Sequence, residues 1–100
     1  MNITDSLYII EYKPHVHNYL INSGHNIKSP EYEKLSSYLL SPKIYEKVIM
    51  IYIKWDKLSF GLNPEIPYQE HKLLQNRINK NNEIDQFLLN IINNFLGQQI

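Results

Sequence analysis

The sequence contains no cysteine and no alanine, and its single arginine is Arg77. Without cysteine the chain can form neither disulfide bonds nor thiolate metal sites. Ten acidic and ten basic side chains give a formal net charge of zero. This balance removes the electrostatic argument for binding nucleic acid or an anionic membrane. It also argues against a protein that imitates the phosphate backbone of a nucleic acid.

Long hydrophobic segments are missing as well. The longest apolar run covers residues 48–53, whereas a helix that spans a membrane needs about 20 apolar residues. The N-terminal stretch has no basic segment and only a short apolar run, which is not the pattern of a secretory signal. We therefore expect a cytoplasmic protein that does not cross a membrane.

The abundant residues point to an AT-rich genome. The chain has 15 Ile, 12 Asn, 9 Lys and 8 Tyr, and all four residue types have codons rich in A and T. Such a bias fits a phage, a mobile element, a low-GC bacterium or an organelle, and it weakens Tyr and Asn as functional signals. A length of 100 residues with 43% hydrophobic content predicts one globular domain over residues 1–100.

The densest apolar region is residues 43–60, which also holds the only Trp. At about 100° per residue, one buried helix face is predicted to contain Ile44, Val48, Ile51, Trp55 and Leu58. The apolar sector is widened by Tyr45, Ile49, Tyr52, Ile53 and Phe60. The lysines gather on the remaining narrow strip, which favours a central helix enclosed by its neighbours. The alternative is a central strand at 47–55, because this run is β-branched and aromatic.

Four further segments have helical patterns: residues 5–23, 30–40, 68–79 and 83–96. Pro14 interrupts the first, so we expect one kinked helix or two helices that meet at Lys13. Ser29 and Ser41 each precede a proline, and their side chains are predicted to cap the helices that follow. Residues 79–82 are predicted to interrupt the helical structure between the last two helices, and 58–67 is expected to be the main loop. The fold class is therefore all-α, a compact bundle of four to five helices, with α+β around a strand at 47–55 as the alternative.

No pattern typical of catalysis or metal binding is present. His15 and His17 would point nearly opposite ways on a helix, and neither they nor His25 has an acidic partner at a recognised metal-site spacing. Asp56 falls inside the apolar sector, which an ion pair with Arg77 or exposure near the helix end would explain. No serine lies in a nucleophile-elbow pattern. We expect no enzyme activity, no cofactor and no metal.

The residues best suited to binding a partner are lysines and tyrosines of the central region. The lysine strip consists of Lys43, Lys47, Lys54 and Lys57, and it forms either a solvated rim or a contact for an acidic protein. Tyr38, Tyr45 and Tyr52 are spaced by seven residues, and they either pack in the core or contribute to an interface.

These features favour a small protein-binding module that acts stoichiometrically, as an inhibitor, immunity factor or regulatory subunit. In length and expected number of helices the chain is similar to bacteriocin immunity proteins and to small phage-encoded inhibitors of host defence systems. The partner is expected to be another protein, with a homo-oligomer as a further option and nucleic acid disfavoured. A small dimeric DNA-binding regulator and a self-associating assembly component are the alternatives.

Overall fold

The computed structural model describes the backbone of residues 3–97 and the side chains of residues 7–97. This part of the chain consists of four helices and contains no strand. The helices are α1 (Ile3–Asn22), α2 (Pro30–Leu39), α3 (Pro42–Ser59) and α4 (Pro67–Gly97). The all-α expectation is confirmed, and the alternative with a strand at 47–55 is wrong.

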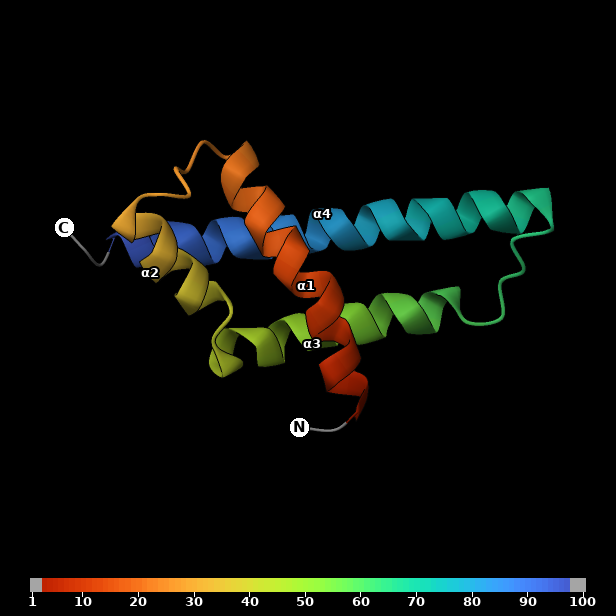
Figure 1. The fold of residues 1–100 in the computed structure, drawn as a ribbon. Coiled ribbons are helices and arrows are strands. Elements are labelled where there is room, and N and C mark those ends of the chain that lie inside the picture. Colours follow the sequence, from red (N-terminus) through yellow and green to blue (C-terminus); the bar gives the residue numbers. More distant parts are fainter. Residues whose placement is uncertain (1–2, 98–100) are drawn as a thin grey trace.

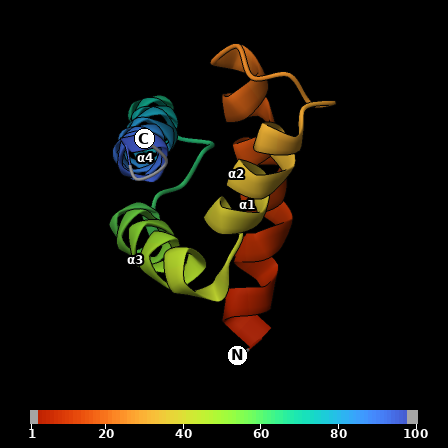
Figure 2. The ribbon, with the colours of Figure 1, turned by 90° about the vertical axis from the view of Figure 1, so that its left-hand side faces the viewer.

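The helices form two layers of unequal length. α3 and α4 run antiparallel as a long hairpin, closed by the loop at residues 60–66 (Figure 1). α1 and α2 lie together on one side of this hairpin, and α1 crosses it at a steep angle (Figures 1 and 2). The molecule measures 50 × 30 × 21 Å. One end of the hairpin therefore projects beyond the α1/α2 layer.

The buried apolar side chains form one cluster between the two layers. Its members are Tyr12, Val16, Leu20, Leu35, Leu39, Ile44, Tyr45, Val48, Ile49, Tyr52, Ile84, Leu88 and Ile92. α3 contributes five of them, more than any other helix. Residues 43–60 thus provide the largest share of the core, as the width of their apolar sector predicts.

The two serine caps differ in what their side chains do. Ser29 Oγ accepts a hydrogen bond from the Glu31 amide at 3.1 Å, so the predicted cap of α2 is confirmed. Ser41 makes no such cap. Its hydroxyl instead donates to the Tyr38 carbonyl at 2.7 Å, because the link between α2 and α3 is so short that this carbonyl lies within reach.

α1 is one helix that continues through Pro14. Pro14 is exposed, whereas Tyr12 and Val16 on either side of it face the core. The proline ring therefore lies in solvent. The helix is held by core contacts before and after the residue whose amide hydrogen is missing.

α4 is also a single helix, so the break predicted at residues 79–82 is wrong. Asn costs only about 0.6 kcal/mol relative to Ala in a helix, and tertiary contacts of this segment oppose that cost. Lys80 Nζ forms an ion pair with Glu11 of α1 at 2.7 Å, and Ile84 is fully buried. Local preference alone suggested a turn, and contacts with the other layer override it.

The apolar stripe of α3 is buried only as far as its neighbours reach. Ile44 and Val48 are buried, but Trp55 is partly exposed and Leu58 is 54% exposed. Phe60, just after the helix, is 90% exposed. The expected burial of Leu58 and Phe60 is therefore wrong, because both lie near the projecting end of the hairpin.

Candidate protein-binding surfaces

The sides of α3 differ in their contacts: one side faces α1, another faces α4, and the remaining side faces neither helix. Tyr52 stacks on Tyr8 of α1, with ring centroids 5.0 Å apart, and Trp55 Nε1 donates to Glu83 of α4 at 3.2 Å. These contacts fix the sides of α3 that face the two neighbouring helices. With about 100° per residue, the lysine strip falls on the remaining side, away from α1. Figure 2 shows that no helix covers the hairpin on that side.

This uncovered surface, which we name the lysine face, consists of Lys43, Lys47, Met50, Lys54 and Lys57. All four lysines are exposed, as the sequence predicts for a solvent-facing strip. Met50 lies among them and is 65% exposed. Within the described part of the chain, Lys43, Lys47 and Lys57 take part in no ion pair.

Lys54 differs from the other three lysines because it has an acidic partner. Its Nζ contacts Glu83 Oε1 on α4 and lies 5.1 Å from the centroid of the Trp55 ring. Glu83 thus accepts from Lys54 and Trp55 together. One lysine joins α3 to α4, which leaves three uncompensated positive charges around Met50.

The neighbouring side of α4 is polar but almost uncharged. Glu83 marks the direction of the lysine face, and residues that follow or precede it at helical spacing lie on the same side. These residues are Asn79, Gln86, Asn90 and Asn94. Amide side chains beside lysines give a hydrated surface on which a partner's carboxylates would meet little repulsion.

The three candidate tyrosines do not share a surface. Tyr45 and Tyr52 are 4% and 1% exposed and belong to the core, so they are not available to a partner. Burial raises the pKa of the Tyr52 phenol well above its ordinary value, and the nearby Glu11 charge adds to the shift. Tyr38 alone is accessible, at 37% exposure. The seven-residue spacing does not place the three tyrosines on one surface, because α2 ends before Pro42 and α3 starts in a new direction.

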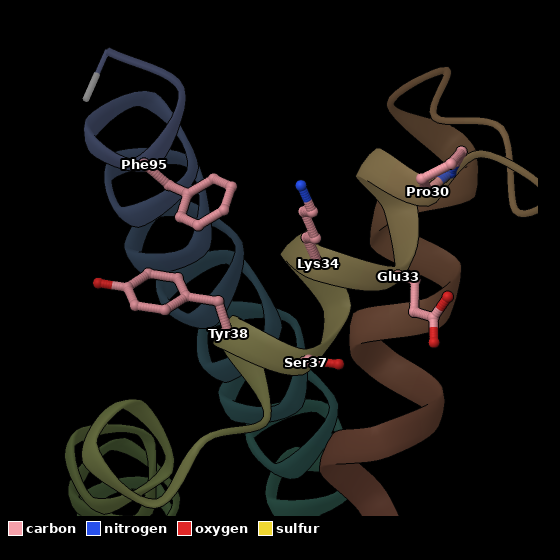
Figure 3. Close-up of a pocket in the computed structure, with 6 residues that line it drawn as sticks. All are labelled: Pro30, Glu33, Lys34, Ser37, Tyr38 and Phe95. Atoms are coloured by element: carbon pink, nitrogen blue, oxygen red, sulfur yellow. The ribbon is translucent and has the colours of Figure 1, made fainter. Parts of the chain in front are cut away.

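Tyr38 lies beside an open depression between α2 and the end of α4. Its ring stacks on Phe95 with centroids 5.0 Å apart. The depression has a volume of about 720 Å³ and is lined by Pro30, Glu33, Lys34, Ser37, Tyr38 and Phe95 (Figure 3). Lys34 and Glu33 supply one charge of each sign at its edge. This hollow can take an apolar side chain, but it presents no converging polar groups.

The histidines are engaged separately. His15 Nε2 contacts Asp85 of α4 at 2.7 Å, and His17 Nδ1 contacts the Tyr32 hydroxyl at 2.6 Å. The two imidazoles therefore serve different helix contacts, as their positions on one helix predict. Among the described residues there is no group of three or more His, Cys, Asp or Glu side chains that could hold a metal ion.

Asp56 is exposed and accepts a hydrogen bond from the Tyr8 hydroxyl. Exposure, rather than an ion pair with Arg77, accounts for the carboxylate on this side of α3. Asp56 and Arg77 line the same small depression without forming an ion pair.

Several exposed apolar residues were not foreseen as surface. They include Met50, Leu58, Phe60, Ile66, Tyr68, Leu74 and Ile78. The sequence holds a partial signal for this, because the loop after Ser59 has apolar residues among its Gly and Pro residues. Which half of α4 stays uncovered depends on where α1 crosses the hairpin, and no local sequence pattern carries that information.

The part of the chain that the structure describes has no helix long and apolar enough to cross a membrane. Comparison of the chain with protein-family models, with curated proteins and with solved structures finds no match.

Proposed function

We propose that this protein works by binding another protein stoichiometrically through the lysine face, as an inhibitor, immunity factor or regulatory subunit does. The observation that carries the proposal is the uncovered side of α3. There Lys43, Lys47 and Lys57 are exposed around the exposed Met50, and none of them forms an ion pair with a side chain of residues 7–97. The partner surface that fits has an apolar contact for Met50 and acidic side chains around it.

The arrangement resembles the anatomy of protein interfaces, in which an apolar centre is surrounded by a polar rim. Methionine is flexible and polarizable, and it adapts to the shape of a partner's apolar side chains. The rim lysines would speed association with an acidic partner and select against basic ones. From Lys43 to Lys57 the face extends over about 21 Å of helix, enough for a short helix or an extended segment of a partner.

A polypeptide suits this face better than a nucleic acid. Lys54 is already compensated by Glu83, and Glu46 adds another carboxylate on α3. Nucleic-acid surfaces depend on many uncompensated cations, whereas here an apolar side chain occupies the centre. The net charge of zero adds no long-range attraction to a phosphate backbone.

The experiment uses a displayed library of random peptides, selected on the immobilised full chain. We expect the enriched peptides to combine Asp or Glu with at least one large apolar residue. Their binding should weaken as salt is raised, because the rim contacts are exposed to solvent. An enrichment without acidic residues would contradict the proposal, and so would salt-sensitive binding of duplex DNA with no acidic peptide selected.

The matched variants change the same charge on opposite sides of the molecule. The triple variant Lys43→Glu, Lys47→Glu, Lys57→Glu should lose peptide binding. The control variant Lys13→Glu, Lys28→Glu, Lys34→Glu alters three exposed lysines of the α1/α2 layer and should retain it. Met50→Ser should weaken binding while it leaves the salt dependence in place. Equal losses in the two triple variants would show that net charge, and not the lysine face, controls binding.

A further inference from the structure

The half of the hairpin that projects beyond α1 lacks a second layer. The α1/α2 layer covers the hairpin from α1 to the C-terminal end of α4, and none of the four helices covers the other half on that side in residues 3–97 (Figure 1). Two antiparallel helices alone bury little apolar surface, so a bundle normally packs them against another pair. The projecting part of the hairpin is therefore a pair of helices without the second pair that would complete a four-helix bundle.

The dimensions of the molecule agree with a missing layer. The radius of gyration is 15.3 Å, against about 13 Å for a compact domain of this length. The accessible surface is 7052 Å², whereas a compact monomer of 12.0 kDa has about 6,000 Å². The excess of about 1,000 Å² matches the area, about 800 Å² per partner, that a standard protein interface covers.

In its uncovered half, α4 has two apolar side chains on the same side as the residues that contact the α1/α2 layer further along the helix. Asp85 marks this direction, because it contacts His15 of α1 at 2.7 Å. Leu74 and Ile78 lie about three and two helical turns before Asp85, within about 20° of it around the helix axis. They are 51% and 44% exposed. They face the position that a second layer would occupy, but α1 does not reach them.

The charges on this side of α4 are complementary to a second copy of the same helix. Arg77 and Glu70 are both exposed, and neither forms an ion pair with another described side chain. They are about 10 Å apart along one helix, too far to pair with each other. In an antiparallel pair of α4 helices with the two-fold axis between Leu73 and Leu74, Arg77 of each copy comes level with Glu70 of the other. A two-fold interface then forms this ion pair twice.

We propose that the protein forms a two-fold symmetric dimer in which the projecting hairpin halves of two copies pack face to face as a four-helix bundle. Leu74 and Ile78 of both copies lie at its centre, and the Arg77–Glu70 pairs flank them. In this arrangement the loop of each copy, with the exposed Phe60 and Ile66, lies near α1 of the other. The lysine face is on the opposite side of the hairpin and stays free, so the dimer does not depend on the function proposed above.

The first test is the oligomeric state of the full chain, measured by light scattering and sedimentation over a wide concentration series. We expect a mass twice the 12.0 kDa of the monomer. Leu74→Glu should raise the dissociation constant of the dimer about thirtyfold or more, as loss of a central apolar contact does. Leu89→Glu, at a 40% exposed position on the other half of the same helix, should leave it unchanged. A monomer at every concentration, or equal effects of the two variants, would overturn the proposal.

The second test exchanges the charges and does not depend on apolar packing. Arg77→Glu and Glu70→Arg should each weaken the homodimer several-fold, because each places like charges together. A mixture of these two variants should form a heterodimer, and the chain with both changes should dimerise like the original protein. Circular dichroism checks that each variant keeps its helix content. If the mixture forms no more dimer than either variant alone, the antiparallel register is wrong.

Discussion

The rings of Tyr8 and Tyr52 stack where α1 crosses α3, with their centroids 5.0 Å apart and their planes 13° from parallel. The Tyr8 hydroxyl donates to Asp56, and Lys80 Nζ lies 5.4 Å from the centroid of the Tyr52 ring. The Tyr52 hydroxyl, by contrast, is buried and has no hydrogen-bond partner in the part of the chain that the structure describes. Packing of the aromatic rings therefore holds this crossing, while the Tyr52 hydroxyl opposes folding.

Removing that hydroxyl should stabilise the protein. We expect Tyr52→Phe to raise the free energy of unfolding by about 1 kcal/mol, because the buried oxygen no longer loses its hydrogen bonds to water on folding. The ring and its stack on Tyr8 remain. Urea denaturation followed by circular dichroism measures the change. A stability loss would show that the hydroxyl has a partner in solution.

The same chemical change at Tyr12 should have the opposite sign. The Tyr12 hydroxyl donates to the Leu39 carbonyl at 2.7 Å and is fully buried. Tyr12→Phe leaves that carbonyl without this donor, so we expect a loss of about 1 kcal/mol of stability. The two variants control for each other, because both delete one oxygen from the same core. Similar effects in both would contradict the difference in hydrogen bonding.

Stability should fall in alkali. Burial raises the pKa of Tyr12 and of Tyr52 well above the ordinary value of 10.0. Above that pH the unfolded chain releases both phenolic protons while the folded chain keeps them, so rising pH favours unfolding. Above pH 10, each tyrosine should lower the free energy of unfolding by about 1.4 kcal/mol per pH unit. Below pH 10 this loss of stability is absent. Chemical denaturation at a series of pH values gives this slope.

The control for the alkaline effect is the exposed Tyr68, which is 74% accessible. Tyr52→Phe should reduce the slope by about 1.4 kcal/mol per pH unit, and Tyr68→Phe should leave it unchanged. An alkaline slope that is the same in Tyr52→Phe and in the unaltered protein would mean that this phenol ionises in the folded state.

Pro14 should be replaceable with a gain in stability. It lies inside α1, where it removes a backbone hydrogen bond, and its ring is exposed and contributes no core packing. Pro14→Ala should raise the free energy of unfolding by about 2 kcal/mol, after allowance for the greater freedom of the unfolded chain. Thermal and urea unfolding both measure this gain.

Two other prolines provide the comparison. Pro30 and Pro42 occupy the first turns of α2 and α3, where a missing amide hydrogen costs nothing. Pro30→Ala and Pro42→Ala should be neutral or slightly destabilising. A gain at these positions as large as at Pro14 would mean that the effect does not come from the helix interior.

The sequence predicted the positions of the helices and their outer ends closely, but it divided α4 into two. Periodicity located α2 and α3 to within a residue or two, because the Ser-Pro pairs mark both starts and the apolar sector of α3 favours a helix over a strand. It divided α4 at residues 79–82, where the polar stretch is locally unfavourable but Lys80 and Ile84 are held by the other layer. It could not separate buried Tyr45 and Tyr52 from accessible Tyr38, since spacing along the chain does not give the angle between two helices.

The order of apolar, polar and charged residues by itself indicated that this chain is mainly helical and that its lysines lie on one side of α3, while the structure excluded the alternative strand at 47–55. Both follow from the fixed rotation per residue of a helix. Only the tertiary structure decided that α1 covers half of the hairpin, and hence that Leu74, Ile78 and Phe60 stay exposed. That outcome depends on where one helix crosses another, which is set by contacts between residues far apart in the sequence, such as His15 with Asp85 and Tyr8 with Tyr52.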